Sequence, residues 1–185
     1  MPAQTFNSLL IAERILLGDV VACAAEGVWG LSCDPFDGDA VEQVLALKGR
    51  SVSKGLIVVA ADEWQLAPVL GHLDRSLRQE LSLSWPGANT WLVDNHGVFP
   101  RWITGDSNEV AVRVTAAPAL AALCRAVGGP LVSTSANPAG ADPAKSAFQV
   151  VRYFGPDLPR AASAVNRNAG PSTIRRAKTG EVIRA

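Results

Sequence analysis

The feature that most constrains the fold is an unbroken apolar run, GLIVVAA, at residues 55–61. A short apolar run bounded by polar segments is typical of a strand that is buried on both faces. Along the rest of the chain, segments with helical spacing of apolar residues alternate with further short apolar runs. Strands interleaved with helices in this way exclude a helical bundle and predict an α/β (α+β) fold around a twisted, mixed sheet.

Capping residues and apolar spacing predict where the individual elements lie. Helices are expected to begin at Asn7 or Ser8, Asp39, Asp62, Asp74, Thr115 and Asp142. Strands are expected at residues 20–24, 27–33, 55–61, 90–93, 110–114, 131–134, 164–165, 173–175 and 182–184. The connections are too irregular for a regular doubly wound sheet.

Length and composition predict a single domain over residues 1–185. A chain of 185 residues with 48% hydrophobic residues buries an ample core, and no internal repeat or long polar linker divides it. No apolar run reaches the roughly 18–20 residues of a membrane helix, and the first residues lack the basic start of a secretory signal. Three widely spaced cysteines without a CxxC motif indicate reduced core residues of a cytoplasmic protein.

Charge is balanced over the whole chain but not along it. The formal net charge is zero, yet residues 145–185 hold eight basic and two acidic residues. This excess is either a solvated basic face or a site for phosphate or RNA. Only two histidines, His72 and His96, are present, so a histidine-based metal site or a Ser-His-Asp triad is poorly supplied.

A cluster of cations at residues 48–54 is the first candidate site. Lys48, Arg50 and Lys54 stand between a predicted helix and the buried strand at 55–61. Cations favour a helix C-terminus on dipole grounds, but Lys54 lies beyond the helix. Two lysine ammonium groups and one planar arginine guanidinium are suited to binding a polyphosphate or a carboxylate. Spacing alone leaves anion binding and a surface role equally open.

Polar residues at strand ends are the second set of candidates. In the run Ser133-Thr134-Ser135-Ala136-Asn137, alternation sends Ser133, Ser135 and Asn137 to one face and Thr134 to the other, unless the run is only a local turn. An arginine inside an apolar strand either snorkels, pairs with a carboxylate or faces a cavity. The further candidates at strand ends or within strands are Thr90, Arg113, Ser172 and Arg175.

Six sequence blocks, in this order and spacing, resemble the YrdC/TsaC family of threonylcarbamoyl-AMP synthases in its short bacterial form. They lie at residues 26–35 (EGVWGLSCDP), 47–56 (LKGRSVSKGL), 85–90 (WPGANT), 111–114 (AVRV), 130–137 (PLVSTSAN) and 171–175 (PSTIR). The Lys-x-Arg and Ser-Thr-Ser-Ala-Asn blocks are the most specific. The likeness runs from about residue 20 to the C-terminus and implies a YrdC-like fold with a deep, basic cavity.

The resemblance implies condensation of L-threonine, bicarbonate and ATP to threonylcarbamoyl-AMP and pyrophosphate. Partner proteins of this family then transfer the threonylcarbamoyl group to tRNA. Lys48 and Arg50 would be catalytic, and Arg50, Thr90 and Arg113 would bind threonine. Mg²⁺ would be held mainly by phosphates. The nucleotide would be bound by Lys54, Ser133, Ser135, Asn137, Ser172 and Arg175.

One block departs from the family pattern. The family usually has Pro-Thr-Glu where this chain has Ala24-Ala25-Glu26. The family's threonine hydroxyl helps hold the substrate, and Ala25 has none. Losing one such hydrogen bond costs about 0.5–1.5 kcal/mol. Glu26 either orients a nearby cation or caps the surface.

Two other functions stay open at this point. A non-catalytic RNA-binding protein of the same fold would use the basic C-terminal third, although a net charge of zero argues against strong binding. An adenylating paralogue with another substrate, such as a carbamoyl-adenylate maker, is conceivable because of the alanines at positions 24 and 25.

Overall fold

The apolar run at residues 55–61 forms strand β3 (Ile57–Ala60), which lies inside an eight-stranded sheet. The computed structural model describes residues 3–166 and 170–185. The strand order is β1-β2-β6-β3-β5-β4-β7-β8. The other strands are β1 (Val21–Ala24), β2 (Trp29–Ser32), β4 (Asn89–Asp94), β5 (Glu109–Val114), β6 (Leu131–Ser135), β7 (Thr173–Arg176) and β8 (Val182–Arg184).

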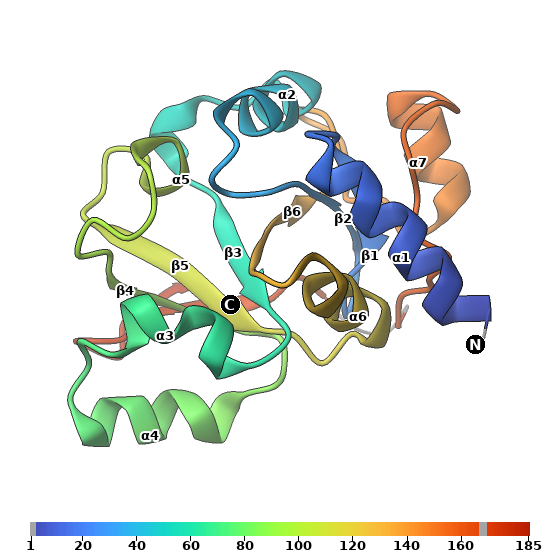
Figure 1. Ribbon diagram of the computed structural model, residues 1–185. Coiled ribbons are helices and arrows are strands. Elements are labelled where there is room, and N and C mark those ends of the chain that lie inside the picture. Colours follow the sequence, from blue (N-terminus) through green and yellow to red (C-terminus); the bar gives the residue numbers. More distant parts are fainter. Residues whose placement is uncertain (1–2, 167–169) are drawn as a thin grey trace.

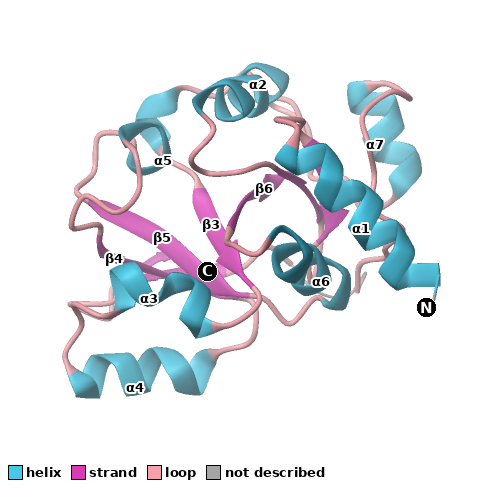
Figure 2. Cartoon of the chain, viewed as in Figure 1, coloured by secondary structure: helices cyan, strands magenta, loops and turns pink. Residues whose placement is uncertain are grey.

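Helices surround this sheet, as Figures 1 and 2 show. None of the helices in the described part of the chain is long and apolar enough to span a membrane. The helices are α1 (Ala3–Leu16), α2 (Gly38–Lys48), α3 (Ala67–Leu70), α4 (Arg75–Ser84), α5 (Arg101–Thr104), α6 (Pro118–Val127) and α7 (Ala147–Phe154), with 3-10 turns η1 (Val52–Lys54) and η2 (Glu63–Leu66).

The sheet is mixed, as the sequence predicts. Strand β3 runs parallel to β5 and antiparallel to β6, and β4 runs parallel to β7. In this register Ile57 stands opposite both Ala111 and Ser133. Residues directly opposite each other point to the same face of a sheet, so these three share one face.

Helices α1 and α6 lie side by side and cover one end of that face (Figure 1). Ile15 of α1 and Leu120 of α6 join Val21, Val59 and Leu131 of the strands in one buried cluster. The alternate strand positions, such as Val58 and Val112, belong to a larger cluster with residues of α2 and α3. Both faces of β3 are therefore buried, which explains its unbroken apolar sequence.

Several predicted helix starts are wrong by a few residues. Helix α1 begins at Ala3, before the predicted Asn7 or Ser8. Helix α2 is capped by Asp37, whose carboxylate accepts from the amide of Ala40 at 3.0 Å, so Asp39 lies inside the helix. The predicted cap of α4, Asp74, is confirmed by its bond from the amide of Leu77 at 2.8 Å.

Helices α6 and α7 start later than predicted because tertiary contacts use the predicted caps or their neighbours. Helix α6 begins at Pro118, while the hydroxyl of Thr115 donates to Glu26. Helix α7 begins at Ala147 with Ser146 as its cap, rather than at Asp142. The backbone of Ala144 is instead bonded to Trp29 and Ala136, which withdraws it from a helix.

The segment before the last two strands also differs from the prediction. Residues 164–165 do not form a strand. Instead, Arg160 forms an isolated parallel bridge with Ala22, and the amide of Ala161 donates to the carbonyl of Ala22 at 2.9 Å. This segment therefore pairs with β1 a few residues earlier than expected.

Candidate active site

A cavity of about 450 Å³ opens on the face of the sheet that carries Ile57, Ala111 and Ser133. Its floor comes from β3, β5 and β6, and its walls include the loops after α2 and before β7. Arg50 and Ser133 both line it, although they lie far apart in the sequence. The cation cluster and the serine-rich run are thus brought to one place.

The segment after α2 carries Arg50 and Lys54 to the cavity. Gly49 ends α2 in the left-handed conformation with φ 59°, which glycine adopts without strain. The Nη2 group of Arg50 donates to the carbonyls of Lys54 (3.3 Å) and Gly55 (2.9 Å). Its Nε group is buried without a partner in the described part of the chain, and burial lowers the pKa of this guanidinium.

The close approach of the neighbouring loop depends on Gly105. A Cβ atom at Gly105 would lie 2.3 Å from the carbonyl oxygen of Ser53, and φ is 65° at this residue. The amide of Asp106 donates to the same carbonyl at 3.2 Å. This contact holds the segment of Lys54 against the loop that follows α5.

Lys48 does not line the cavity but lies buried behind it. Its ammonium donates to the carbonyls of Ser135 and Asn137 and to the side-chain oxygen of Asn137. Burial, and then the charge of Arg50, lower the pKa of Lys48 to about 8. Lys48 therefore connects the end of α2 to residues 133–137, the serine-rich turn.

Some residues of the serine-rich turn line the cavity, and others support it from outside the lining. Ser133 and Ser135 line the cavity, and atoms of Thr134 between them also contribute to its lining. Strand β6 ends at Ser135, where the chain turns and strict alternation ends. Asn137 lies outside the lining, where its side-chain oxygen accepts from the hydroxyl of Ser135 at 2.6 Å.

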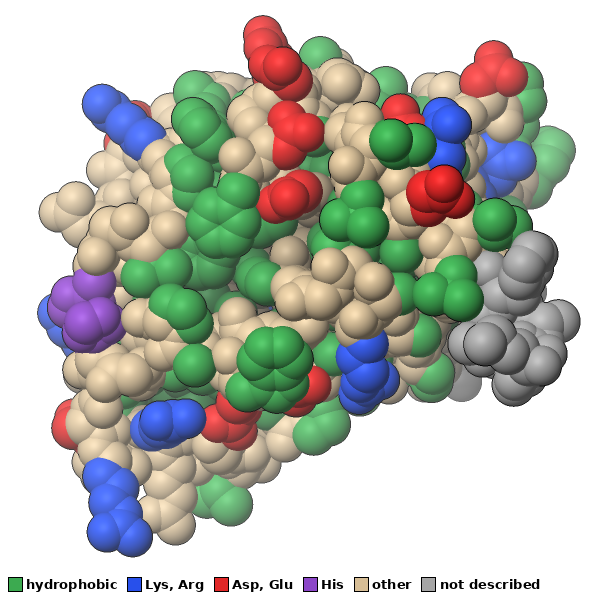
Figure 3. Space-filling model, in the orientation of Figure 1, with side chains coloured by type: hydrophobic (Ala, Val, Ile, Leu, Met, Phe, Trp, Pro, Cys, Tyr) green, Lys and Arg blue, Asp and Glu red, His purple; other side chains and the backbone are tan. Residues whose placement is uncertain are grey.

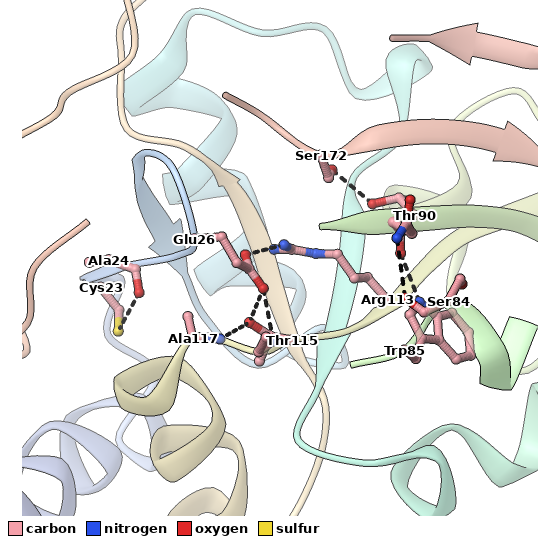
Figure 4. A network of polar contacts seen from close by, with 12 residues as sticks. Cys23, Ala24, Glu26, Ser84, Trp85, Thr90, Arg113, Thr115, Ala117 and Ser172 are labelled. Carbon is pink, nitrogen blue, oxygen red and sulfur yellow. Dashed lines mark hydrogen bonds and ion pairs between the residues drawn. The ribbon is translucent and has the colours of Figure 1, made fainter. Parts of the chain in front are cut away.

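Arg113 lines the cavity from β5 and forms an ion pair with Glu26 (Figure 4). The same carboxylate accepts from the hydroxyl of Thr115 (2.7 Å) and the amide of Ala116 (2.9 Å). Glu26 thus orients a cation, one of its two predicted roles. Next to it, Ala25 lines the cavity without a hydroxyl, so the departure from the family pattern lies at the site itself.

Thr90 does not line the cavity but contacts a residue that does. Its buried hydroxyl shares a 2.9 Å hydrogen bond with that of Ser172, which does line the cavity (Figure 4). The Nη2 group of Arg184 donates to the carbonyl of Ser172 at 2.7 Å and to its hydroxyl at 3.2 Å. Ser172 is therefore held from β4 on one side and from β8 on the other.

The cation that the sequence predicted at the end of this wall lies outside the cavity lining. Arg175 is exposed and lies outside the cavity, whereas Arg176 and Arg184 line it. Alternation along β7 explains the difference, because Ile174 and Arg176 point to the cavity and Arg175 to the opposite face. In the sequence, Arg184 was visible only as an arginine within the short strand predicted at residues 182–184.

The lining carries more cations than carboxylates. Glu26 is paired with Arg113, and Glu109 is paired with Arg176 at 3.0 Å. Arg50, Lys54 and Arg184 line the cavity without a carboxylate in ion-pair distance in the described residues. Arg50, Arg113 and Arg184 line the same cavity, and burial, followed by the charges of Arg113 and Arg50, lowers the pKa of Arg184. Such a cavity attracts a polyanion.

Among the described residues, no titratable cluster forms a metal cage and no cysteine is part of the cavity lining. In residues 3–166 and 170–185 no group of three or more His, Cys, Asp or Glu side chains is placed to hold a metal ion. The described cysteines are buried free thiols, and burial raises the pKa of Cys23 to about 12. The arrangement can position anions and neutralise charge.

Comparisons with known proteins identify relatives of this chain. A family model for Sua5, YciO and YrdC proteins, described as "Telomere recombination", matches residues 13–185. The threonylcarbamoyl-AMP synthase of Cellvibrio japonicus is 52% identical over 94% of this chain and 92% of its own length. That of Nitrosococcus oceani is 48% identical over the full length of both chains.

Solved structures show the same fold. The crystal structure of P. abyssi Sua5 complexed with L-threonine matches with a TM-score of 0.84 and 28% identity, over 93% of this chain. This chain spans about half of that protein, 51%. E. coli YciO, at 19% identity and a TM-score of 0.83, shares the fold over 100% of this chain and 90% of its own. The chain therefore belongs to the Sua5/YciO/YrdC family.

Proposed function

We propose that the cavity is the active site of an ATP-dependent threonylcarbamoyl-AMP synthase. The reaction converts L-threonine, bicarbonate and ATP to threonylcarbamoyl-AMP and pyrophosphate. The observation that carries this proposal is the convergence of Arg50, Ser133 and Ser135 on one cavity with unpaired cations. Full-length relatives named threonylcarbamoyl-AMP synthase support this activity over the RNA-binding and altered-substrate alternatives. On the face drawn in Figure 3, both acidic and basic side chains are present.

The chemistry needs positioning and charge neutralisation more than a protein nucleophile. The uncharged threonine amine forms an N–C bond to the carbon of bicarbonate, a C–O bond of bicarbonate breaks, and hydroxide leaves with the amine proton as water, which gives a carbamate. A carbamate oxygen then attacks the α-phosphorus of ATP, and the bond to pyrophosphate breaks. Phosphoryl and adenylyl transfers of this kind depend on alignment and on stabilising the developing negative charge.

The residues divide between the two ends of the cavity. Arg50 is the catalytic cation, because it faces the cavity with an unpartnered buried Nε group. Arg113 and Thr90 belong to the threonine end, with Thr90 acting through Ser172. Lys48 contributes by holding the serine-rich turn.

The nucleotide end takes its donors from separate segments of the chain. Ser133, Ser135 and Ser172 offer hydroxyl groups, and Asn137 orients Ser135. Lys54 and Arg184 supply charge for the phosphates. Arg184 takes the place that the sequence had assigned to Arg175.

Magnesium fits this site only as an ion that accompanies the nucleotide. The carboxylates that line the cavity, Glu26 and Glu109, are both engaged by arginines. Mg²⁺ would therefore be held by phosphate oxygens and water, with no cage of protein ligands.

The product would serve tRNA modification in the cytoplasm. Threonylcarbamoyl-AMP is a mixed anhydride, so partner proteins would use it as the activated donor for adenosine in tRNA. Direct contact with RNA would use the basic C-terminal segment. Such contact would weaken steeply with added salt.

The decisive experiment measures pyrophosphate release from ATP by the full chain with Mg²⁺. Release should require both L-threonine and bicarbonate, and mass spectrometry should detect threonylcarbamoyl-AMP. Folded protein that releases no pyrophosphate under these conditions would sink the proposal. Calorimetric binding of carbamoyl phosphate without any response to threonine would instead favour the altered-substrate alternative.

A further inference from the structure

Glu26, in the turn between β1 and β2, is a point where separate segments of the chain meet. Its carboxylate accepts from Arg113 of β5, from the hydroxyl of Thr115 and from the amide of Ala116 (Figure 4). Its backbone carbonyl accepts from the amide of Asn166 at 2.9 Å. The turn that lines the cavity is thereby tied to β5, to the start of α6 and to the segment before β7.

The ion pair of Glu26 and Arg113 is almost fully covered. The side chains are 15% and 6% exposed, respectively. Burial opposes ionisation of Glu26, but Arg113, Thr115 and Ala116 together outweigh it and hold the pKa of this carboxyl below its ordinary value. Glu26 is therefore charged at neutral pH.

Arg113 depends on this carboxylate for a second reason. Its Nε group is buried without a partner in the described residues, and Arg50 and Arg184 line the same cavity. Removing one partner of a buried ion pair leaves an uncompensated charge, which is strongly unfavourable. Without Glu26, Arg113 would move away from the neighbouring cations or draw in water.

Thr115 completes the arrangement from outside the cavity lining. It is buried, its hydroxyl donates to Glu26, and the same oxygen accepts from the amide of Ala117 at 3.1 Å. The start of α6 thus fixes the direction of the Thr115 hydroxyl. That hydroxyl fixes one oxygen of Glu26 and leaves the other for Arg113.

We propose that Glu26 is a positioning residue that holds the guanidinium of Arg113 in place for the carboxylate of the amino-acid substrate, with Thr115 orienting Glu26. The inference rests on the proposed function, in which Arg113 belongs to the threonine end. Glu26 neutralises part of the guanidinium charge and anchors one edge of its planar fork. The guanidinium is then oriented before the substrate arrives, which reduces the entropy lost on binding.

The test uses Glu26→Gln, which keeps the size and an acceptor oxygen but removes the charge. The threonine KM should rise about tenfold or more, since hydrogen bonds to charged groups are the strong ones. The ATP KM should change much less. The matched control is Glu42→Gln, an exposed carboxylate on α2.

Thr115→Val provides a second variant that touches neither the substrate nor Arg113. It keeps the side-chain shape and removes the hydroxyl, so the threonine KM should rise in the same direction by a smaller factor. Glu26→Asp keeps the charge and should restore part of the affinity lost in Glu26→Gln.

A purely structural role gives a different result. Partial unfolding lowers the amount of active enzyme, and hence the apparent kcat, but leaves the KM of the folded molecules unchanged. Unchanged threonine KM values in Glu26→Gln and Thr115→Val would overturn the inference, and so would equal rises for threonine and ATP. Threonine Kd from calorimetry needs no turnover, so it tests Glu26 even if the wild-type chain releases no pyrophosphate.

Discussion

The ammonium of Lys48 lies 3.1 Å from the backbone carbonyl of Asn137 and 3.2 Å from its side-chain oxygen. The carbonyl of Ser135 accepts from the same ammonium. One buried cation at the end of α2 therefore holds the turn that carries Ser133 and Ser135 into the cavity. The position of the hydroxyl groups depends on a residue that does not line the cavity.

Replacing Lys48 should affect stability as well as activity. Lys48→Met removes the donor from three oxygens, and unsatisfied buried acceptors cost roughly 1–3 kcal/mol. Urea unfolding should show this loss, and pyrophosphate release should fall with it. Lys145→Met, at an exposed lysine, is the control. An unchanged free energy of unfolding would show that the turn does not depend on Lys48.

The pH dependence of activity should report the charge of Lys48. Its folded-state pKa of about 8 lies below the ordinary lysine value of 10.5, because the side chain is buried and lies near Arg50. Between these values the unfolded chain binds more protons, so this group's contribution to stability rises with pH. The turn meanwhile loses its charged donor, so kcat/KM should fall above pH 8 without unfolding. Lys48→Arg should move this decline to higher pH, and an unmoved decline would assign it to another group.

Arg50→Ala should separate activity from stability. The half-buried guanidinium is bonded to two carbonyls of its own loop, so its loss should change the free energy of unfolding by no more than about 1 kcal/mol. Activity should fall by about 100-fold or more, as expected for a group that stabilises developing charge. Steady-state kinetics and urea unfolding measure the two effects, with the exposed Arg75→Ala as control. Unfolding of Arg50→Ala would give the residue a structural role.

Two neighbouring arginines near the C-terminus should behave differently. Arg184→Ala removes an unpaired cation from the cavity and should raise the ATP KM about tenfold. Arg175→Ala removes an exposed cation on the opposite face and should leave the KM within about twofold. The reverse order of effects would restore the assignment made from the sequence.

Adding a hydroxyl at position 25 should improve threonine binding. Ala25 lines the cavity next to Glu26, and Ala25→Thr supplies a donor and acceptor there. A gain of about 0.5–1.5 kcal/mol corresponds to a threonine KM lowered by roughly two- to tenfold. Ala24→Ser, beside it in β1, controls for a general effect of an added hydroxyl. A threonine KM that stays the same or rises would show that a hydroxyl at position 25 does not contribute to threonine binding.

The sequence by itself determined most of the strands and the class of groups that meet in the cavity, but not every member. The run at residues 55–61 predicted a doubly buried strand because its apolar residues do not alternate. The family resemblance carried by the Lys-x-Arg and Ser-Thr-Ser-Ala-Asn blocks implied one site, and Arg50, Ser133 and Ser135 do line the same cavity. Apolar runs and residue spacing within a motif are visible in the sequence because they depend on nearest neighbours and on periodicity.

Only the tertiary structure decided which residues line the cavity and which support it from outside. Lys48 and Asn137 lie outside the cavity lining and contact each other, Arg184 lines the cavity where Arg175 does not, and Glu26 pairs with Arg113. These outcomes depend on strand register and on contacts between segments far apart in the chain. A shift of one residue along β7 exchanges the face of every side chain, and a cap such as Thr115 is redirected once a buried carboxylate competes for its hydroxyl.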